Sequence, residues 1–167
     1  MTRNTRIVLA SRPTGEVKPE NFRVETTELP ALADGQILTR NLFLSLDPYM
    51  RPRMTEMNSY TPPFELGATL TGGAVAEVID SKNPRYQNGD HIIGMLGWEQ
   101  HSLSDGRLLR KLDPKAAPLT AHLGILGMPG YTANSSGAFS VFCRLVCTAS
   151  GPSLRERAPF PPAIVSM

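Results

Sequence analysis

The chain has 167 residues and a formal net charge of +2, with 41% hydrophobic and 19% charged residues. This length suits one domain, or one domain and part of a second. The charge is too small to indicate a nucleic-acid partner or an anionic membrane, and no apolar run approaches the roughly 20 residues of a membrane span. The first 12 residues carry three arginines and no long apolar core, so we expect no secretory signal and a cytoplasmic protein.

The charge is unevenly distributed along the chain. Residues 1–133 contain 10 Arg and 4 Lys against 14 acidic residues, whereas residues 134–167 contain 3 Arg, one Glu and both cysteines. The whole net charge therefore belongs to the last 34 residues. This step in composition predicts a boundary between Ala133 and Asn134.

The first 115 residues are predicted to be rich in β-strands. Short apolar or alternating runs, separated by Gly and Pro, are typical of half-buried strands. The predicted strands are 6–10, 22–26, 36–46, 74–79, 91–96 and 107–112. Asn88-Gly89 indicates a two-residue hairpin before the fifth run. These features predict a small barrel or sandwich, with Gly67, Gly72, Gly73, Gly94 and Gly97 at sharp bends.

Helical signals are few and come late. Residues 49–60 have no clear period and predict a loop with a helical turn. Apolar residues at spacings of three and four predict a helix over 118–127, ended by Met128-Pro129-Gly130, with another helix starting at Tyr131. Beyond residue 134 neither period is present, and the prolines at 159, 161 and 162 argue against a packed element.

Most of the chemically interesting residues have a structural interpretation. His91, His101 and His122 share no metal-binding spacing, and a structural or solvated role is favoured for each. Cys143 and Cys147 lie four apart with no further ligand beside them, which favours buried or free thiols over a zinc site.

The glycines of the run G-x-x-G-x-x-G also favour a structural role. Gly124, Gly127 and Gly130 do not follow the dinucleotide-binding pattern G-x-G-x-x-G. We expect the first two glycines to serve close helix packing and Gly130 to form a turn between helices.

Tyr49 is the first candidate for catalysis. It lies in the run Leu46-Asp47-Pro48-Tyr49-Met50-Arg51. A tyrosine hydroxyl can donate a hydrogen bond to a carbonyl oxygen that gains negative charge during a reaction, although a lone tyrosine is more often a packing residue. In the same stretch Asp47 is a turn former, and Arg51 and Arg53 either pair with acids or are solvated.

Several segments together resemble one family. The run N-L-F-L-S-L-D-P-Y-M-R over residues 41–51 resembles a segment of the zinc-independent medium-chain dehydrogenases/reductases, in the subgroup of prostaglandin, alkenal and curcumin reductases. Residues 72–78 and 89–94 are similar to barrel strands of that family. The run L-G-I-L-G-M-P-G-Y-T-A over residues 123–133 is similar to its interdomain segment. The resemblance covers about residues 5–133.

The resemblance implies a mainly β fold with short helices, a GroES-like partly open β-barrel over residues 1–115. It also implies an interdomain helical segment over 116–133 and reduction, with NADPH, of the C=C bond of α,β-unsaturated aldehydes and ketones. By motif match Tyr49 would be the catalytic donor in the substrate pocket. Met128, Pro129, Gly130 and Thr132 would bind the nicotinamide end of the cofactor. Leu44, Ala68 and Thr69 stand where zinc-dependent relatives carry ligands, so no catalytic metal is expected.

The chain departs from the family after Ala133. No βαβ unit follows, and 34 residues barely reach the roughly 30 that one unit requires. We therefore expect the Rossmann cofactor domain to be missing and residues 134–167 to be an atypical, poorly ordered tail from a frameshift or truncation. A genuine short C-terminal extension is the alternative.

The expected absence of the cofactor domain also determines which activity and partners we expect for the chain. The chain alone is expected to be inactive. Expected partners are a small enone or enal, with no nucleic acid and no membrane. We expect an apolar face of Leu119, Leu123 and Leu126 to be exposed and to cause homo-oligomer formation or poor solubility. A non-enzymatic GroES-like binding or assembly module and a quinone reductase of the same superfamily are the alternative functions.

Overall fold

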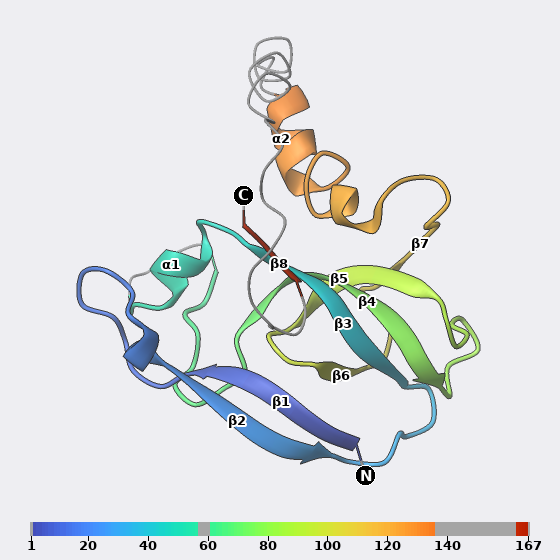
Figure 1. The fold of residues 1–167 in the computed structure, drawn as a ribbon, viewed down its shortest axis with the longest axis horizontal. Helices are drawn as coiled ribbons and strands as arrows, with labels where there is room; N and C mark the ends of the chain where they lie inside the picture. Colours follow the sequence, from blue (N-terminus) through green and yellow to red (C-terminus); the bar gives the residue numbers. More distant parts are fainter. Residues whose placement is uncertain (1, 57–60, 136–162, 167) are drawn as a thin grey trace.

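The computed structural model describes residues 2–56, 61–135 and 163–166. Two sheets dominate this part of the chain (Figure 1). The small sheet pairs β1 (Thr2–Leu9) with β2 (Phe22–Leu29) in antiparallel register. The large sheet has the order β6-β3-β4-β5-β7, with β8 added alongside β3.

The remaining elements have the following bounds. In the large sheet they are β3 (Ile37–Leu46), β4 (Thr71–Ser81), β5 (His91–Gly97), β6 (His101–Ser104), β7 (Arg110–Leu112) and β8 (Ala163–Ser166). The α-helices are α1 (Met50–Arg53) and α2 (Met128–Ser135), and the 3-10 helices are η1 (Pro19–Asn21) and η2 (Leu119–His122). The molecule is thus mainly β with short helices and open sheets, as expected. None of the helices in the described residues has the length and apolar character needed to cross a membrane.

The two sheets are joined along one seam. Ile7 donates its amide hydrogen to the carbonyl of Trp98 (2.8 Å) and accepts one from Leu70 (3.1 Å), while Trp98 donates to Leu70 (2.7 Å). The indole of Trp98 stacks on Phe22 of β2 with ring centres 6.4 Å apart. Because backbone bonds and an aromatic contact cross the same seam, the small sheet is held against the large one.

β3 changes its buried face part-way along its length. Its first half alternates in the way expected for a half-buried strand, with Ile37 and Thr39 buried and Arg40 exposed. The register with β4 then shifts between Asn41 and Phe43. A bulge of this kind bends a strand and redirects its side chains. Beyond it Leu44 and the polar Ser45 are both buried, and Ser45 lies two residues before Asp47.

Three apolar clusters form the core. One lies within the large sheet around Ile37, Val78 and Ile92, and another joins the small sheet to α1 through Leu9, Met50, Phe64 and Leu70. The third packs Leu123, with Leu119 beside it, on Val75 and Leu112. η2 is therefore fixed to the large sheet, and α2 follows on the side away from β1 and β2 (Figure 1).

The segment 118–127 differs from the expected helix. Only η2 is helical there, and Gly124 and Gly127 continue it as turns, with Gly127 donating to the carbonyl of Gly124 at 2.9 Å. Met128-Pro129-Gly130 begins α2 and does not end a helix. The prediction of an exposed apolar face is also wrong for Leu119 and Leu123, because both pack on the large sheet. Leu126 is 51% exposed, as predicted.

Four smaller differences concern strands. The turn at Asn88-Gly89 exists, but residues 82–90 connect β4 to β5, so it is no two-residue hairpin. β6 was not predicted, because His-Ser-Leu-Ser carries little apolar signal. β7 begins at Arg110, not residue 107, and Leu108 is 91% exposed. β8 was not predicted either.

Candidate functional site

A groove of about 1010 Å³ lies between the end of β3 with α1 on one side and the segment of η2 and α2 on the other. Strands β4 and β5 form its floor with Gly73, Ile93, Gly94 and Met95, and Leu108 and Arg110 also line it. Its lining is mostly apolar. Four of the five predicted site residues line it: Tyr49, Met128, Pro129 and Thr132.

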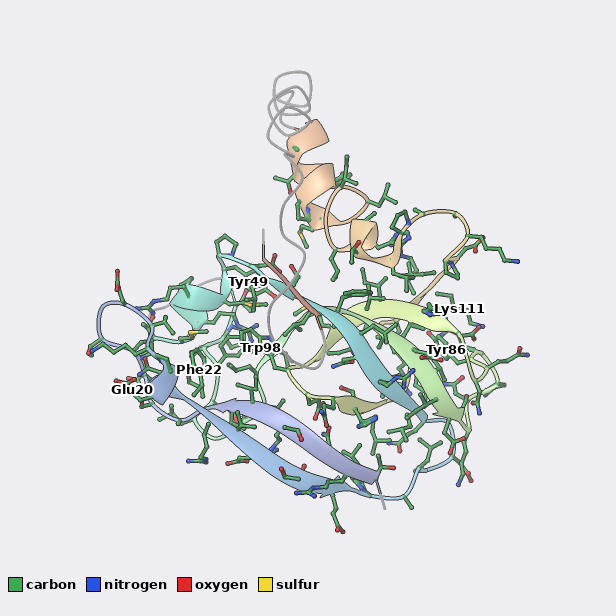
Figure 2. The ribbon with its side chains drawn as sticks, viewed as in Figure 1. Glu20, Phe22, Tyr49, Tyr86, Trp98 and Lys111 are labelled. Atoms are coloured by element: carbon green, nitrogen blue, oxygen red, sulfur yellow. The ribbon has the colours of Figure 1, made fainter. Side chains whose placement is uncertain are left out.

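The corner after β3 places Tyr49 at the groove. Pro48 follows Asp47, and the amide of Met50 donates to the Asp47 carbonyl at 3.0 Å, which closes a tight turn. Tyr49 then has helical backbone angles and packs against the cluster that joins α1 to the small sheet. In Figure 2 Tyr49 lies beside α1, with Trp98 near it on the side of β1. Tyr49 is half-buried and lines the groove.

The buried side chain of Met50 packs beside Tyr49 at this corner. Met50 is 3% exposed, and a Cβ on Gly72 would come 2.5 Å from the end of its side chain. A side chain at this position would require the end of the flexible Met50 side chain to move aside, with the Trp98 indole nitrogen 3.1 Å away on another side.

Two polar residues of β3 and its corner face the same space. The Ser45 hydroxyl donates to Asp47 Oδ1 at 2.8 Å, and both residues line the groove. Ser45 is 4% exposed. This bond satisfies a buried hydroxyl and fixes the carboxylate next to Tyr49.

The wall formed by η2 and α2 depends on close backbone contacts of two glycines. A Cβ on Gly127 would overlap the carbonyl oxygen of His122, and a Cβ on Gly130 would overlap that of Ile125. Gly130 also donates to the Gly124 carbonyl at 3.2 Å. Gly130 is the predicted site residue that does not line the groove, and it lies in the first turn of α2, not between two helices. Its close approach places Met128, Pro129 and Thr132 at the groove.

Several groove residues were not predicted as site residues. Among them are Ser45, Asp47, Arg53, Thr61, Met95, Leu108, Arg110 and His122. Asp47 and Arg53 offered a signal in the sequence, because they lie two residues before and four residues after Tyr49. Both ring nitrogens of His122 are buried without a hydrogen-bond partner among the described residues.

The described residues hold no group of three or more His, Cys, Asp or Glu side chains arranged to bind a metal. His91, His101 and His122 belong to β5, β6 and η2 respectively. Cys143 and Cys147 lie outside the described residues.

Comparison with known proteins decides the family. A family model described as the N-terminal domain of oxidoreductase matches residues 5–112. The chain belongs to this family. The oxidoreductase N-terminal domain therefore includes the strands of both sheets up to β7, together with the corner that carries Tyr49.

Individual relatives extend the match beyond residue 112. Over 131 residues, the chain is 47% identical to the NADPH-dependent curcumin reductase of Escherichia coli K12. The match covers 78% of this chain and 38% of that protein. Prostaglandin reductase 1 of Rattus norvegicus is 44% identical over 116 residues, covering 68% of this chain and 33% of that protein. The crystal structure of CurA from Vibrio vulnificus matches with a TM-score of 0.73 and 38% identity, covering 78% of this chain and 39% of that one. The chain thus spans less than two fifths of the length of these relatives.

Proposed function

We propose that residues 1–133 provide the N-terminal catalytic part of an NADP-dependent oxidoreductase that reduces the C=C bond of α,β-unsaturated aldehydes and ketones. Within it, residues 1–115 form the GroES-like domain, residues 116–133 form an interdomain segment, and residues 134–167 are a tail of different origin. One observation carries the proposal. Tyr49, from the D-P-Y-M-R run, and Met128, Pro129 and Thr132, from the G-M-P-G-Y-T-A run, line the same groove although about 80 residues separate the two runs.

The proposed role of Tyr49 follows from the charge that the reaction creates. When hydride is added to the β-carbon of an enone, negative charge develops on the carbonyl oxygen. A hydrogen-bond donor fixed at that oxygen stabilises the transition state more than the substrate. The tight turn fixes the backbone beside Tyr49, and the residue packs against the cluster that contains Met50, so little reorganisation is needed.

The groove also fits one end of the cofactor. It is large enough for a nicotinamide ring beside a small enone, and α2 places side chains of Met128, Pro129 and Thr132 along one wall. NADPH, when bound there, would supply the hydride. These residues would orient the ring and exclude water from the reacting carbon, with Gly130 allowing α2 to begin so close to Ile125. The relatives named NADPH-dependent or NADP-dependent support this assignment.

A chimera tests the proposed function. Residues 1–133 are joined to the part of the E. coli curcumin reductase that follows its matching region, and NADPH oxidation is measured with 3-nonen-2-one. We expect turnover by the chimera and none by the 167-residue chain alone. Tyr49→Phe should lower kcat by about 100-fold, the typical effect of removing one such donor.

The control and the contrary outcomes are defined by the same chimera. Tyr131→Phe changes a tyrosine that is 76% exposed and does not line the groove, so its kcat should stay unchanged. A folded chimera without turnover would favour a binding or assembly module. A Tyr49→Phe chimera as active as its parent would remove Tyr49 from the mechanism.

A further inference from the structure

Arg53 is a cation fixed on the wall of the groove. Its Nε donates to the carbonyl of Pro62 at 2.9 Å, and its guanidinium carbon lies 4.0 Å from the centre of the Phe64 ring. Phe64 is itself only 6% exposed. Arg53 lines the groove with Thr61 and Tyr49. One hydrogen bond and one stacking contact therefore restrain a half-buried guanidinium beside the proposed catalytic tyrosine.

The two neighbouring arginines are used differently. Arg12 pairs with Glu56 through Nε at 3.0 Å, and Arg51 donates from Nη2 to the Gly15 carbonyl at 2.6 Å. Neither of them lines the groove. Of these three arginines, only Arg53 is directed to the space that a ligand would enter.

The charge of Arg53 is uncompensated within the described residues. Among the residues that the structure describes, no carboxylate lies within ion-pair distance of it, and its two terminal nitrogens have no hydrogen-bond partner there. Asp47 lines the same groove, but its Oδ1 accepts from Ser45 and it forms no ion pair with Arg53. A half-buried guanidinium without an anion is a ready partner for an anionic group on a ligand.

Geometry favours a carboxylate as that group. A guanidinium presents parallel N–H donors that match the two oxygens of a carboxylate, and a mostly apolar surrounding strengthens the pair compared with bulk water. Arg110 also lines the groove, but it is exposed and lies on the short strand β7. It lacks the contacts that orient Arg53, so Arg53 is the better candidate.

We propose that Arg53 is a specificity-determining residue that selects enones carrying a carboxylate. The inference rests on the proposed function, since it takes the groove as the enone site. The enone carbonyl would lie at Tyr49 and the carboxylate of the same ligand at Arg53, so that a single small molecule contacts both residues of the α1 wall.

Binding to the full 167-residue chain tests the inference without turnover. The ligands are 4-(3-oxobut-1-enyl)benzoate and its methyl ester, which share the enone and differ in charge, and isothermal titration gives both Kd values. We expect the carboxylate to bind about tenfold more tightly than the ester, the size of one charge-assisted hydrogen-bonded pair. Arg53→Met should remove this preference and leave the Kd of the ester nearly unchanged.

Matched variants separate charge from folding. Arg51→Met removes an arginine from the same short helix but outside the groove, and should keep the preference. Arg53→Lys keeps the charge without the paired donors and should keep part of it. If Arg53→Met does not fold, Arg53→Gln replaces it, and the Kd of the ester reports whether the groove is intact.

The failure of this inference is distinct from the failure of the proposed function. Equal affinity for carboxylate and ester in the unchanged chain, or a preference that survives in Arg53→Met or Arg53→Gln, overturns the role of Arg53 while ester binding still supports the enone site. Absence of binding by both ligands overturns the inference and the enone site together.

Discussion

At the scale of single residues, Gly130 shows how one missing side chain positions a wall of the groove. The first turn of α2 lies directly on the carbonyl of Ile125, and a Cβ on Gly130 has no space there. The opposing atom is backbone, so it cannot move aside as a flexible side chain would. The motif match predicted Gly130 as a site residue from its neighbours; its contribution through backbone packing could not be read from the glycine itself.

Gly130→Ala should therefore displace α2 and destabilise the chain by about 1–3 kcal/mol, the usual cost of overfilling a packed site. The free energy of unfolding, measured by urea denaturation, checks this. Gly73→Ala is the control, because a Cβ there would meet its nearest atoms at 3.7 and 3.8 Å, an ordinary contact distance. Equal stability of the two variants would contradict the packing role.

His101 gives a second prediction, on pH. Burial lowers the pKa of His101 below its ordinary value of 6.5, the positive charge of Arg40 lowers it further, and Glu99 opposes both. The folded state therefore resists a proton that the unfolded state accepts, so stability falls as the pH drops below 6.5 and stops falling below the lowered pKa. The carboxyls of Glu25 and Asp90, whose pKa values are also lowered from 4.5 and 3.8, lose their contribution only at more acidic pH.

Replacement of the imidazole tests this assignment. His101→Gln should reduce the loss of unfolding free energy between about pH 7.5 and 5.5, a window around the ordinary pKa of histidine. Urea denaturation at several pH values provides the measurement. A slope identical to that of the unchanged chain would show that His101 does not contribute to it.

At the scale of elements, the edge of β3 that faces away from β4 has two different partner strands along its length. Residues Ile37–Arg40 pair with β6. Residues Phe43–Leu46, which β6 does not reach, pair with β8. Since β8 comes from the end of the chain, the second half of β3 depends on a strand distant in sequence. Removal of residues 163–167 leaves that half with an unpaired edge.

Deletion of residues 163–167 should speed hydrogen exchange of amides in 43–46 and leave those in 37–40 protected. Hydrogen-exchange mass spectrometry resolves the two halves, and the half paired with β6 is the internal control. Unchanged exchange in 43–46 would show that β8 does not protect β3.

The elements also show what sequence patterns could predict. β1 to β5 carry apolar runs or alternation long enough to indicate strands, and they were predicted. β6 and β8 are four residues each and are defined by pairing with β3, which no local pattern contains. The segment 118–127 has helical spacing, but its glycines fold against backbone carbonyls, so tertiary contacts override the periodicity.

At the scale of the whole molecule, large apolar side chains are exposed around α2. Ile125, Leu126, Met128 and Tyr131 are each more than half exposed. The sequence indicated an exposed apolar face here but assigned it partly to Leu119 and Leu123, which pack on the large sheet. Helical spacing identifies one apolar face, and the turns at Gly124 and Gly127 rotate the following residues away from it.

We expect this surface to cause concentration-dependent self-association. Sedimentation velocity at increasing protein concentration is the measurement, and the double variant Ile125→Ser with Leu126→Ser should shift the chain toward monomer. Val24→Ser, which removes an exposed apolar residue from β2 in the small sheet, should leave association unchanged. A monodisperse monomer at all concentrations would contradict the expectation.

The parallel pairing of β8 has a practical consequence for handling the protein. Ser166 lies opposite Leu46, one residue before the Asp47 corner, whereas Thr2 begins β1 on the opposite side of the molecule (Figure 1). An affinity tag or fusion partner after Ser166 would therefore stand beside the Asp47 corner, which lines the groove, and compete with ligands for space. The N-terminus is the better place for a tag, and a small fluorophore at the C-terminus would report on groove occupancy.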